Sequence, residues 1–365
     1  MEKKYAELLI DYCLDLQKNE KLYISTTTAA IPLVSEIFRY GTQKGAIIEL
    51  DLSFSDQNKI FYDHARNHQL TYVPVLKKKA MEEFDAYLAI KAPFNLMETQ
   101  HIDSNKRKIR QKAFSSLNQA YYKRTADGSM KRTLCLYPTH SSAQMAGMSL
   151  DEYREFVFHA CRLNEIDPTS AWLDVRKKQQ KLVAFLNRAK HIRYLNKASD
   201  ISFSTKGRTW INSDGRTNMP SGEVFTGPVE ESVQGVVHFD YPSIYLGTEV
   251  SGITLEVKDG KVVSWKADTG GEVLDEVFST PGANYFGEVA IGTNYNIQRP
   301  TKNILFDEKI GGTIHMAVGQ SYKQSGGKNT STIHWDMIAN MTDGGQIWVD
   351  GEQIYKDGRF LNGLF

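Results

Sequence analysis

Two segments near the C-terminal end of this chain place histidine and carboxylate side chains on one face of an otherwise apolar strand. His315 lies in TIHMAVG, and His334 and Asp336 lie in TIHWDMI, in both cases alternating with apolar residues. Because successive side chains of a strand point to opposite faces, each segment would bury its apolar face and collect its ionisable groups on the other. Buried ionisable groups must be paired or bound to a metal. The pattern therefore predicts two strands that share a metal site.

Further residues with suitable chemistry lie in neighbouring motifs. Glu288 stands in GEVAIG, Glu308 in FDE, and Tyr322 in GQSY, shortly after the first histidine. Upstream, Glu223 lies in NMPSGEVFTGP, whose proline and glycine residues predict an irregular backbone. Taken by itself, Glu223 is equally compatible with a solvated surface turn and with a functional site.

The composition is that of an ordinary globular protein, and it excludes several classes of partner. The 44 basic and 43 acidic residues give a formal net charge of +1, so we expect neither nucleic acid nor an anionic membrane as partner. No apolar run is long enough to cross a bilayer, and the N-terminal MEKKYAELLIDYC lacks the apolar core of a signal peptide. Cys13, Cys135 and Cys161 are far apart and odd in number, which favours reduced cysteines and a cytoplasmic location.

Strands and helices alternate through the first half of the chain. Strands are expected at residues 21–26, 46–53, 86–92 and 132–138, with helices at 2–18, before Tyr40, and at 56–68, 76–83 and 103–125. Such alternation predicts an α/β fold with a doubly wound, mostly parallel sheet. Ser149 is expected to cap the helix in SLDEYREFVFHA, and a second long helix follows in DPTSAWLDVRKKQQKLVAFLNRAK.

After about residue 189, short β-like segments separated by glycines replace the helical pattern, and KDGK among them is typical of a hairpin turn. A length of 365 residues is sufficient for two domains with sizeable cores. We therefore predict an N-terminal α/β domain over residues 1–189 and a β-rich α+β domain with the metal site over residues 190–365.

The motifs together resemble the M29 family of metallo-aminopeptidases. The specific part of the resemblance is NMPSGEVFTGP, GEVA, the FDE ahead of IHMAVGQSY, and IHWDMI, and looser similarity extends into the first half. The resemblance implies a dinuclear metal centre with the ligands Glu223, Glu288, Glu308, His315, His334 and Asp336, and it makes Tyr322 the catalytic tyrosine. Two stretches depart from the family pattern. The spacing from FDE to His315 is longer here, and the loop between Tyr322 and His334 is shorter.

The chemistry implied by this resemblance suits these residue types. Two divalent ions can share a hydroxide and polarise a peptide carbonyl, and carboxylates with imidazoles suit zinc, cobalt or manganese. Glu288 is our choice for the base or the bridging ligand, and the Tyr322 hydroxyl would donate a hydrogen bond to the oxyanion. The predicted function is the removal of N-terminal residues from short unblocked peptides. The resemblance also implies a homodimer, with the N-terminal domains helping to enclose the active site.

Two other functions are compatible with parts of the pattern. His315, His334 and Asp336 form a two-histidine, one-carboxylate set that could hold a single Fe(II), as in ring-cleaving dioxygenases of dihydroxypyridine that share this fold. That use does not require the additional glutamates and the tyrosine. A non-catalytic peptide-binding or structural protein is a third possibility, against which stands the cost of burying idle carboxylates.

Three histidines elsewhere in the chain could be mistaken for metal ligands, and we call them decoy histidines. His64 and His68 have helical spacing but lack the HExxH glutamate, so we interpret them as a solvated helix face. His238, in GVVHF, is interpreted as a hydrogen-bonded core histidine.

Overall fold

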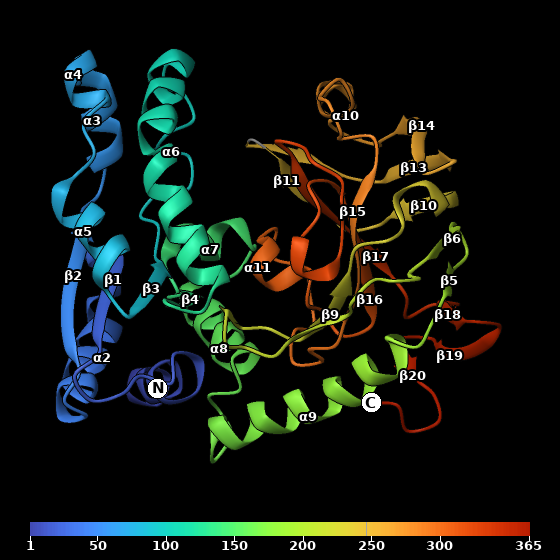
Figure 1. Ribbon diagram of the computed structural model, residues 1–365, viewed down its shortest axis with the longest axis horizontal. Helices are drawn as coiled ribbons and strands as arrows, with labels where there is room; N and C mark the ends of the chain where they lie inside the picture. Colours follow the sequence, from blue (N-terminus) through green and yellow to red (C-terminus); the bar gives the residue numbers. More distant parts are fainter. Residues whose placement is uncertain (246) are drawn as a thin grey trace. The chain divides into compact units, whose positions relative to one another are not determined.

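The division of the chain into two units differs in position from the predicted one. The computed structural model describes residues 1–245 and 247–365. Unit 1 comprises Met1–Thr169 and Arg216–Met219, and unit 2 comprises Ser170–Gly215 and Pro220–Phe365 (Figure 1). The boundary falls before residue 189 because the helix α9 (Pro168–Leu186) buries Leu182, Val183 and Leu186 in the core of unit 2.

Unit 1 is built around a five-stranded parallel sheet with the order β2-β1-β3-β4-β8. Its strands are β1 (Lys21–Thr27), β2 (Ile47–Ser53), β3 (Ala86–Lys91), β4 (Lys131–Leu136) and β8 (Asn218–Met219). From β1 the chain adds β2 on one side of the sheet, and then β3 and β4 on the other side. Because parallel crossovers are right-handed, connections that run in opposite directions place their helices on opposite faces of the sheet. The predicted doubly wound sheet is thereby confirmed, except that β8 comes from a segment we had expected in the second domain.

Helices make the connections in unit 1. They are η2 (Thr28–Ala30), α2 (Ile31–Gln43), α3 (Gln57–His64), α4 (Asn67–Leu70), α5 (Val75–Glu83), α6 (Ser104–Ala126), α7 (His140–Met145) and α8 (Leu150–Ala160). The predicted cap of α8 is confirmed: Ser149 Oγ accepts from the Glu152 amide at 3.2 Å, and a Glu152 carboxylate oxygen accepts from the Ser149 amide at 2.8 Å.

Two predicted helices are interrupted. The region predicted as helix over residues 2–18 forms α1 (Glu2–Glu7) and the π-helix η1 (Leu8–Cys13), and it ends early because Asp15 takes a left-handed conformation with φ of 43°. The region predicted as helix over residues 56–68 forms α3 and α4, which are separated because Ala65 is extended.

In the residues that the structure describes, unit 2 contains two large antiparallel sheets and one small one. The eight-stranded sheet has the order β14-β13-β10-β6-β5-β18-β19-β20, and the five-stranded sheet has the order β17-β16-β15-β9-β7. The first consists of β5 (His191–Leu195), β6 (Asp200–Ser204), β10 (Gln234–Phe239), β13 (Ile253–Lys258), β14 (Lys261–Lys266), β18 (Gln346–Val349), β19 (Glu352–Lys356) and β20 (Arg359–Phe360). The second consists of β7 (Ile211–Ser213), β9 (Glu223–Thr226), β15 (Phe286–Gly292), β16 (Thr313–Gly319) and β17 (His334–Asn340). The small sheet pairs β11 (Ser243–Tyr245) with β12 (Thr248–Val250), and the remaining helices are α10 (Gly271–Phe278), α11 (Ile304–Asp307), η3 (Glu230–Ser232) and η4 (Lys323–Ser325).

One apolar cluster joins both large sheets of unit 2 to α9. The cluster includes the side chains on one face of the five-stranded sheet. Among them are the alternate residues Ile314, Met316 and Val318 of β16, and Trp335 and Met337 of β17. Full burial of a side chain of this size stabilises the fold by about 2 kcal/mol. The predicted alternation is confirmed, and it leaves the opposite face of the same strands to the polar residues.

The KDGK hairpin is also confirmed. Asp259 and Gly260 connect β13 to β14 with φ of 49° and 79°. Positive φ at both central residues is what a tight type I′ turn requires. Among the helices of the described residues, none is long and apolar enough to cross a membrane.

Candidate metal centre

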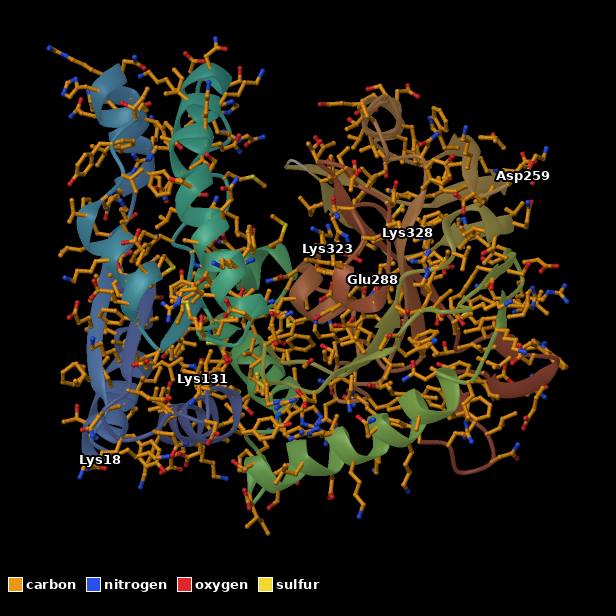
Figure 2. All side chains as sticks on the ribbon, viewed as in Figure 1. Lys18, Lys131, Asp259, Glu288, Lys323 and Lys328 are labelled. Carbon is orange, nitrogen blue, oxygen red and sulfur yellow. The ribbon has the colours of Figure 1, made fainter. Side chains whose placement is uncertain are left out.

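Four adjacent strands of the five-stranded sheet carry five of the six residues predicted as metal ligands. These are Glu223 on β9, Glu288 on β15, His315 on β16, and His334 and Asp336 on β17. The strands are hydrogen-bonded in the order β17, β16, β15, β9, and Figure 2 labels Glu288 among the side chains of unit 2. The sheet therefore assembles on one face residues that are far apart in the sequence.

Glu223 begins a buried strand, so the reading of this residue as a solvated surface turn is wrong. Gly222 precedes it with φ of 113°, and a Cβ at that position would lie 2.7 Å from Cβ of Asn294. Only glycine fits there without strain. The buried Gln179 of α9 donates from Nε2 to the carbonyl of Glu223 at 3.1 Å, which fixes the start of the strand.

A β-bulge at Gly287 decides which way Glu288 points. Phe286 pairs with Val318, whereas Glu288 pairs with Ala317, so Gly287 is an extra residue between the two pairs. Phe286 and Glu288 would otherwise share a face, but the bulge sends Phe286 into the apolar cluster and Glu288 to the polar face. A Cβ on Gly287 would lie 2.5 Å from a carbonyl oxygen of Gly319, which explains the glycine.

Glu288 stands between the two histidines. His315 Nε2 lies 3.4 Å from Oε1 of Glu288, and His334 Nε2 lies 3.5 Å from Oε2 of the same carboxylate. On the outer sides, His315 Nε2 lies 3.3 Å from Glu223 Oε2, and His334 Nε2 lies 3.4 Å from Asp336 Oδ2. The arrangement is two imidazole–carboxylate pairs joined by one shared glutamate.

Glu308 follows α11 and joins the same cluster, together with a lysine that the sequence patterns did not single out. Potential ligand atoms of Glu308, His315 and Asp336 lie within 4.8 Å of one another. The side chain of Lys309 is fully buried, and its ammonium contacts Glu308 Oε1 and lies 3.6 Å from Glu223 Oε1. All six predicted ligands are therefore brought together, but one oxygen of Glu308 is already occupied by a cation.

Several polar atoms of this cluster fit a bound cation. Within the described part of the chain, Glu223 Oε2, Asp336 Oδ1 and both ring nitrogens of His315 are buried without a hydrogen-bond partner. Ligand atoms of Glu223, Glu288 and His315 form one group within 4.8 Å, and those of Glu288, His334 and Asp336 form another. Buried oxygen and imidazole donors in such groups fit divalent transition metals such as zinc, cobalt or manganese.

The orientation of His334 supports ligation through Nε2. Its Nδ1 lies 2.8 Å from the carbonyl oxygen of Gln320, so Nδ1–H donates to the backbone and Nε2 is left facing the carboxylates. Metal-binding histidines are commonly oriented by such a hydrogen bond from the second ring nitrogen.

The protein's own charges shift the pKa values of these groups strongly. Burial lowers the pKa of both histidines, but the neighbouring carboxylates outweigh it and raise the pKa to about 9 for His315 and about 10 for His334. Burial raises the pKa of Glu288, and it raises the pKa of Glu308 to about 8. For Asp336 the effect of burial is outweighed by His334, which lowers the pKa to about 2. The cluster therefore attracts positive charge strongly.

Tyr322 lies next to this cluster. Its ring centroid is 5.1 Å from that of His334 and 5.6 Å from that of Phe225, a residue of β9. Burial and the nearby carboxylates, Glu288 first, raise the pKa of Tyr322 well above its usual range. Its hydroxyl is thus a protonated hydrogen-bond donor at neutral pH. The residue is still 45% exposed, which leaves it accessible to a ligand.

The decoy histidines lie outside this centre. His64 belongs to α3 and His68 to α4, so the two residues do not share one continuous helix. Both are exposed, in agreement with their interpretation as solvated residues. The Nδ1 of His238 lies 2.9 Å from Oγ1 of Thr254, so the predicted hydrogen bond is confirmed, but the residue is half-buried and does not belong to the core.

Fold and centre together define a class of protein, an α/β protein whose candidate metal ligands lie mainly on an antiparallel sheet. Within that class the chain belongs to the M29 family of thermophilic metalloproteases, whose family model matches residues 1–360. This membership confirms the predicted kind of enzyme, a metal-dependent peptide hydrolase.

The relatives that the chain resembles are aminopeptidases. It is 27% identical to aminopeptidase 2 of Geobacillus stearothermophilus, over 98% of this chain and 94% of the relative. It is 32% identical to aminopeptidase T of Thermus thermophilus, over 56% of this chain and 55% of the relative. The structure of wild-type AmpT from Thermus thermophilus matches it with a TM-score of 0.85 at 23% identity, covering 99% of this chain and 98% of that one. The structural match confirms the predicted fold, and the comparisons do not favour the dioxygenase alternative.

Proposed function

We propose that this chain is a dinuclear aminopeptidase that removes N-terminal residues from short peptides with a free α-amine. The observation that carries the proposal is the position of Glu288, whose two oxygens face two separate imidazole–carboxylate groups. A carboxylate shared in this way is suited to bridge two cations. The names of the related aminopeptidases support N-terminal cleavage as the reaction.

The proposed ligands divide into two sets. Glu223 and His315 would hold one ion, His334 and Asp336 the other, and Glu288 would bridge them. Two bound divalent ions would supply an activated water and polarise the scissile carbonyl. Four carboxylates lie in the cluster, and Lys309 offsets one of their charges.

The remaining groups have roles that follow from their positions. Because Glu288 is engaged from both sides, it fits a bridging ligand better than a base. Glu308, which lies beside His315 and Asp336 and contacts Lys309 through Oε1, would take the proton from the attacking water through its other oxygen. The hydroxyl of Tyr322 would donate a hydrogen bond to the oxyanion that forms on the scissile carbonyl.

The test of this function compares two forms of one substrate. Purified protein supplied with zinc, cobalt or manganese is expected to release the N-terminal residue from an unblocked di- or tripeptide, but not from its N-acetylated form. Amino-acid release is measured by chromatography. Equal cleavage of the blocked peptide, or no cleavage of any unblocked one, would contradict the proposal.

Replacing Tyr322 by phenylalanine is expected to lower kcat by roughly 100- to 1000-fold, because an oxyanion donor acts in the transition state. The ring and its contacts with Phe225 and His334 are retained, so the metal content should be unchanged. Steady-state kinetics and elemental analysis of the same preparation check both statements. A variant that keeps normal kcat would show that this hydroxyl is not the donor.

A further inference from the structure

The residues that follow Tyr322 form a loop that is held by a buried ion pair. This segment, Tyr322–Asn329, is called here the tyrosine loop; it contains η4, and Gly326 takes a left-handed conformation with φ of 83°. Figure 2 labels Lys323 and Lys328 of this loop. Within the described residues the Tyr322 hydroxyl has no hydrogen bond, so the backbone of the loop and the two ring contacts determine where it lies.

Arg208 and Glu230 approach this loop from two other connections of unit 2. Arg208 lies between β6 and β7, and Glu230 lies between β9 and β10, in η3. The Arg208 guanidinium forms an ion pair with Glu230 Oε2, and the two side chains are 5% and 10% exposed. Removal of either partner would leave an uncompensated buried charge, so the pair is expected to act as one unit.

Both members of the pair bind the backbone of the tyrosine loop. The second arm of the Arg208 guanidinium donates to the carbonyl oxygen of Gly326. Glu230 Oε1 accepts from the amides of Lys328 at 2.7 Å and Asn329 at 3.2 Å. Hydrogen bonds to a charged partner are about twice as strong as neutral ones, so these three contacts add substantially to the neutral bonds that Asn329 Nδ2 donates to the carbonyls of Gly282 and Gly319.

The connection from these contacts to Tyr322 is short. Ser325 is buried, its carbonyl accepts from the amide of Thr209 at 2.9 Å, and its hydroxyl donates to the carbonyl of Tyr322 at 2.7 Å. The amide of Thr209 directly follows Arg208 in the chain. The ion pair therefore holds the far end of the loop while its neighbours hold the backbone of the tyrosine.

We propose that Arg208 and Glu230 form a clamp on the tyrosine loop that positions the Tyr322 hydroxyl for catalysis. The inference rests on the proposed function of Tyr322 and extends it to two residues whose contacts described above include none of the candidate ligands. They are positioning residues. Loss of the clamp is expected to lower kcat with little change in KM or metal content.

The test uses the full-length, metal-loaded protein and an unblocked dipeptide. Arg208→Lys is the main variant, because it retains the positive charge but cannot bond Glu230 and Gly326 together in the same fork geometry. Glu230→Gln is the second variant and retains an acceptor for the two amides. Arg193→Lys is the matched control, because Arg193 pairs with Asp200 between β5 and β6 and does not touch the loop.

Each variant is made in the natural chain and in the Tyr322→Phe background. A displaced catalytic group is expected to lower kcat by roughly 10- to 100-fold in the natural background. In the Tyr322→Phe background, where the hydroxyl is already missing, the clamp variants should change kcat by less than about twofold. An equal loss in both backgrounds would overturn the proposal, since the pair would then act on overall structure and not through Tyr322.

Hydrogen exchange tests the clamp independently of the catalytic assignment. Peptides that cover the tyrosine loop are expected to exchange faster in the clamp variants and unchanged in the Arg193→Lys control. Unchanged exchange in the clamp variants would overturn the clamp. If Tyr322→Phe itself left kcat intact, the proposed catalytic role of Tyr322 would be wrong, and so would the proposal that the clamp positions it for catalysis. Faster exchange in the clamp variants would still support the clamp on the loop.

Discussion

Replacing Glu288 by glutamine is expected to lower kcat by about 1000-fold or more, because the change removes the one group proposed to join both halves of the centre. An amide cannot supply the second anionic oxygen that faces the other histidine, so at least one metal ion should also be lost. Both effects are measured on one preparation, by peptide hydrolysis and by elemental analysis of the ions per chain.

The fold of this variant should persist. Burial raises the pKa of the Glu288 carboxyl, so a neutral amide at this position removes a cost of desolvation in the metal-free protein. Thermal unfolding without metal should therefore occur at the same or a higher temperature than in the natural chain. Glu276→Gln, on the exposed side of α10, is the control and should leave activity unchanged. Full activity in Glu288→Gln would show that the centre has been assigned wrongly.

Removing metal with a strong chelator is expected to abolish peptide hydrolysis and to lower the melting temperature. A ligand present at about 1000 times its Kd stabilises a folded protein by about 4 kcal/mol, and the six converging side chains belong to the folded state alone. Adding back zinc, cobalt or manganese should restore both activity and stability, with saturation at two ions per chain. Differential scanning calorimetry and elemental analysis give the two readouts.

The control for this experiment is the Glu288→Gln variant, whose melting temperature should respond less to the chelator. Two results would contradict the dinuclear proposal. One is saturation of activity at a single ion per chain. The other is a single tightly held iron with no hydrolysis of unblocked peptides after the other metals are added.

The strands of the centre could be predicted from the sequence because their signal is local. His315 alternates with Ile314 and Met316, and a period of two residues determines which side chains share a face. The capping residue Ser149 and the KDGK turn are equally local, since their backbone contacts lie within a few residues. The α/β alternation of unit 1 follows from the same kind of pattern.

Other features could not be predicted because they depend on contacts between distant segments. The bulge at Gly287 reverses the face of Glu288 relative to Phe286, and it requires a glycine because the backbone of Gly319 approaches from another strand. Lys309 carries no sequence signal that separates it from a surface lysine, and only the fold buries it beside Glu223. The sequence does not show which unit receives the apolar face of α9, because the pattern of an amphipathic helix is the same in either case.

The sequence by itself determined the residue types of the centre, the strands that carry most of them, and the family to which the chain belongs. The tertiary structure decided that Glu223 is buried beside His315, that Glu288 lies between the two histidines, and that Arg208 and Glu230 contact the loop of Tyr322. The physical reason is the range of the interactions. Side-chain periodicity is set within a strand, whereas charge pairing and strand register act between segments that the chain connects only through its fold.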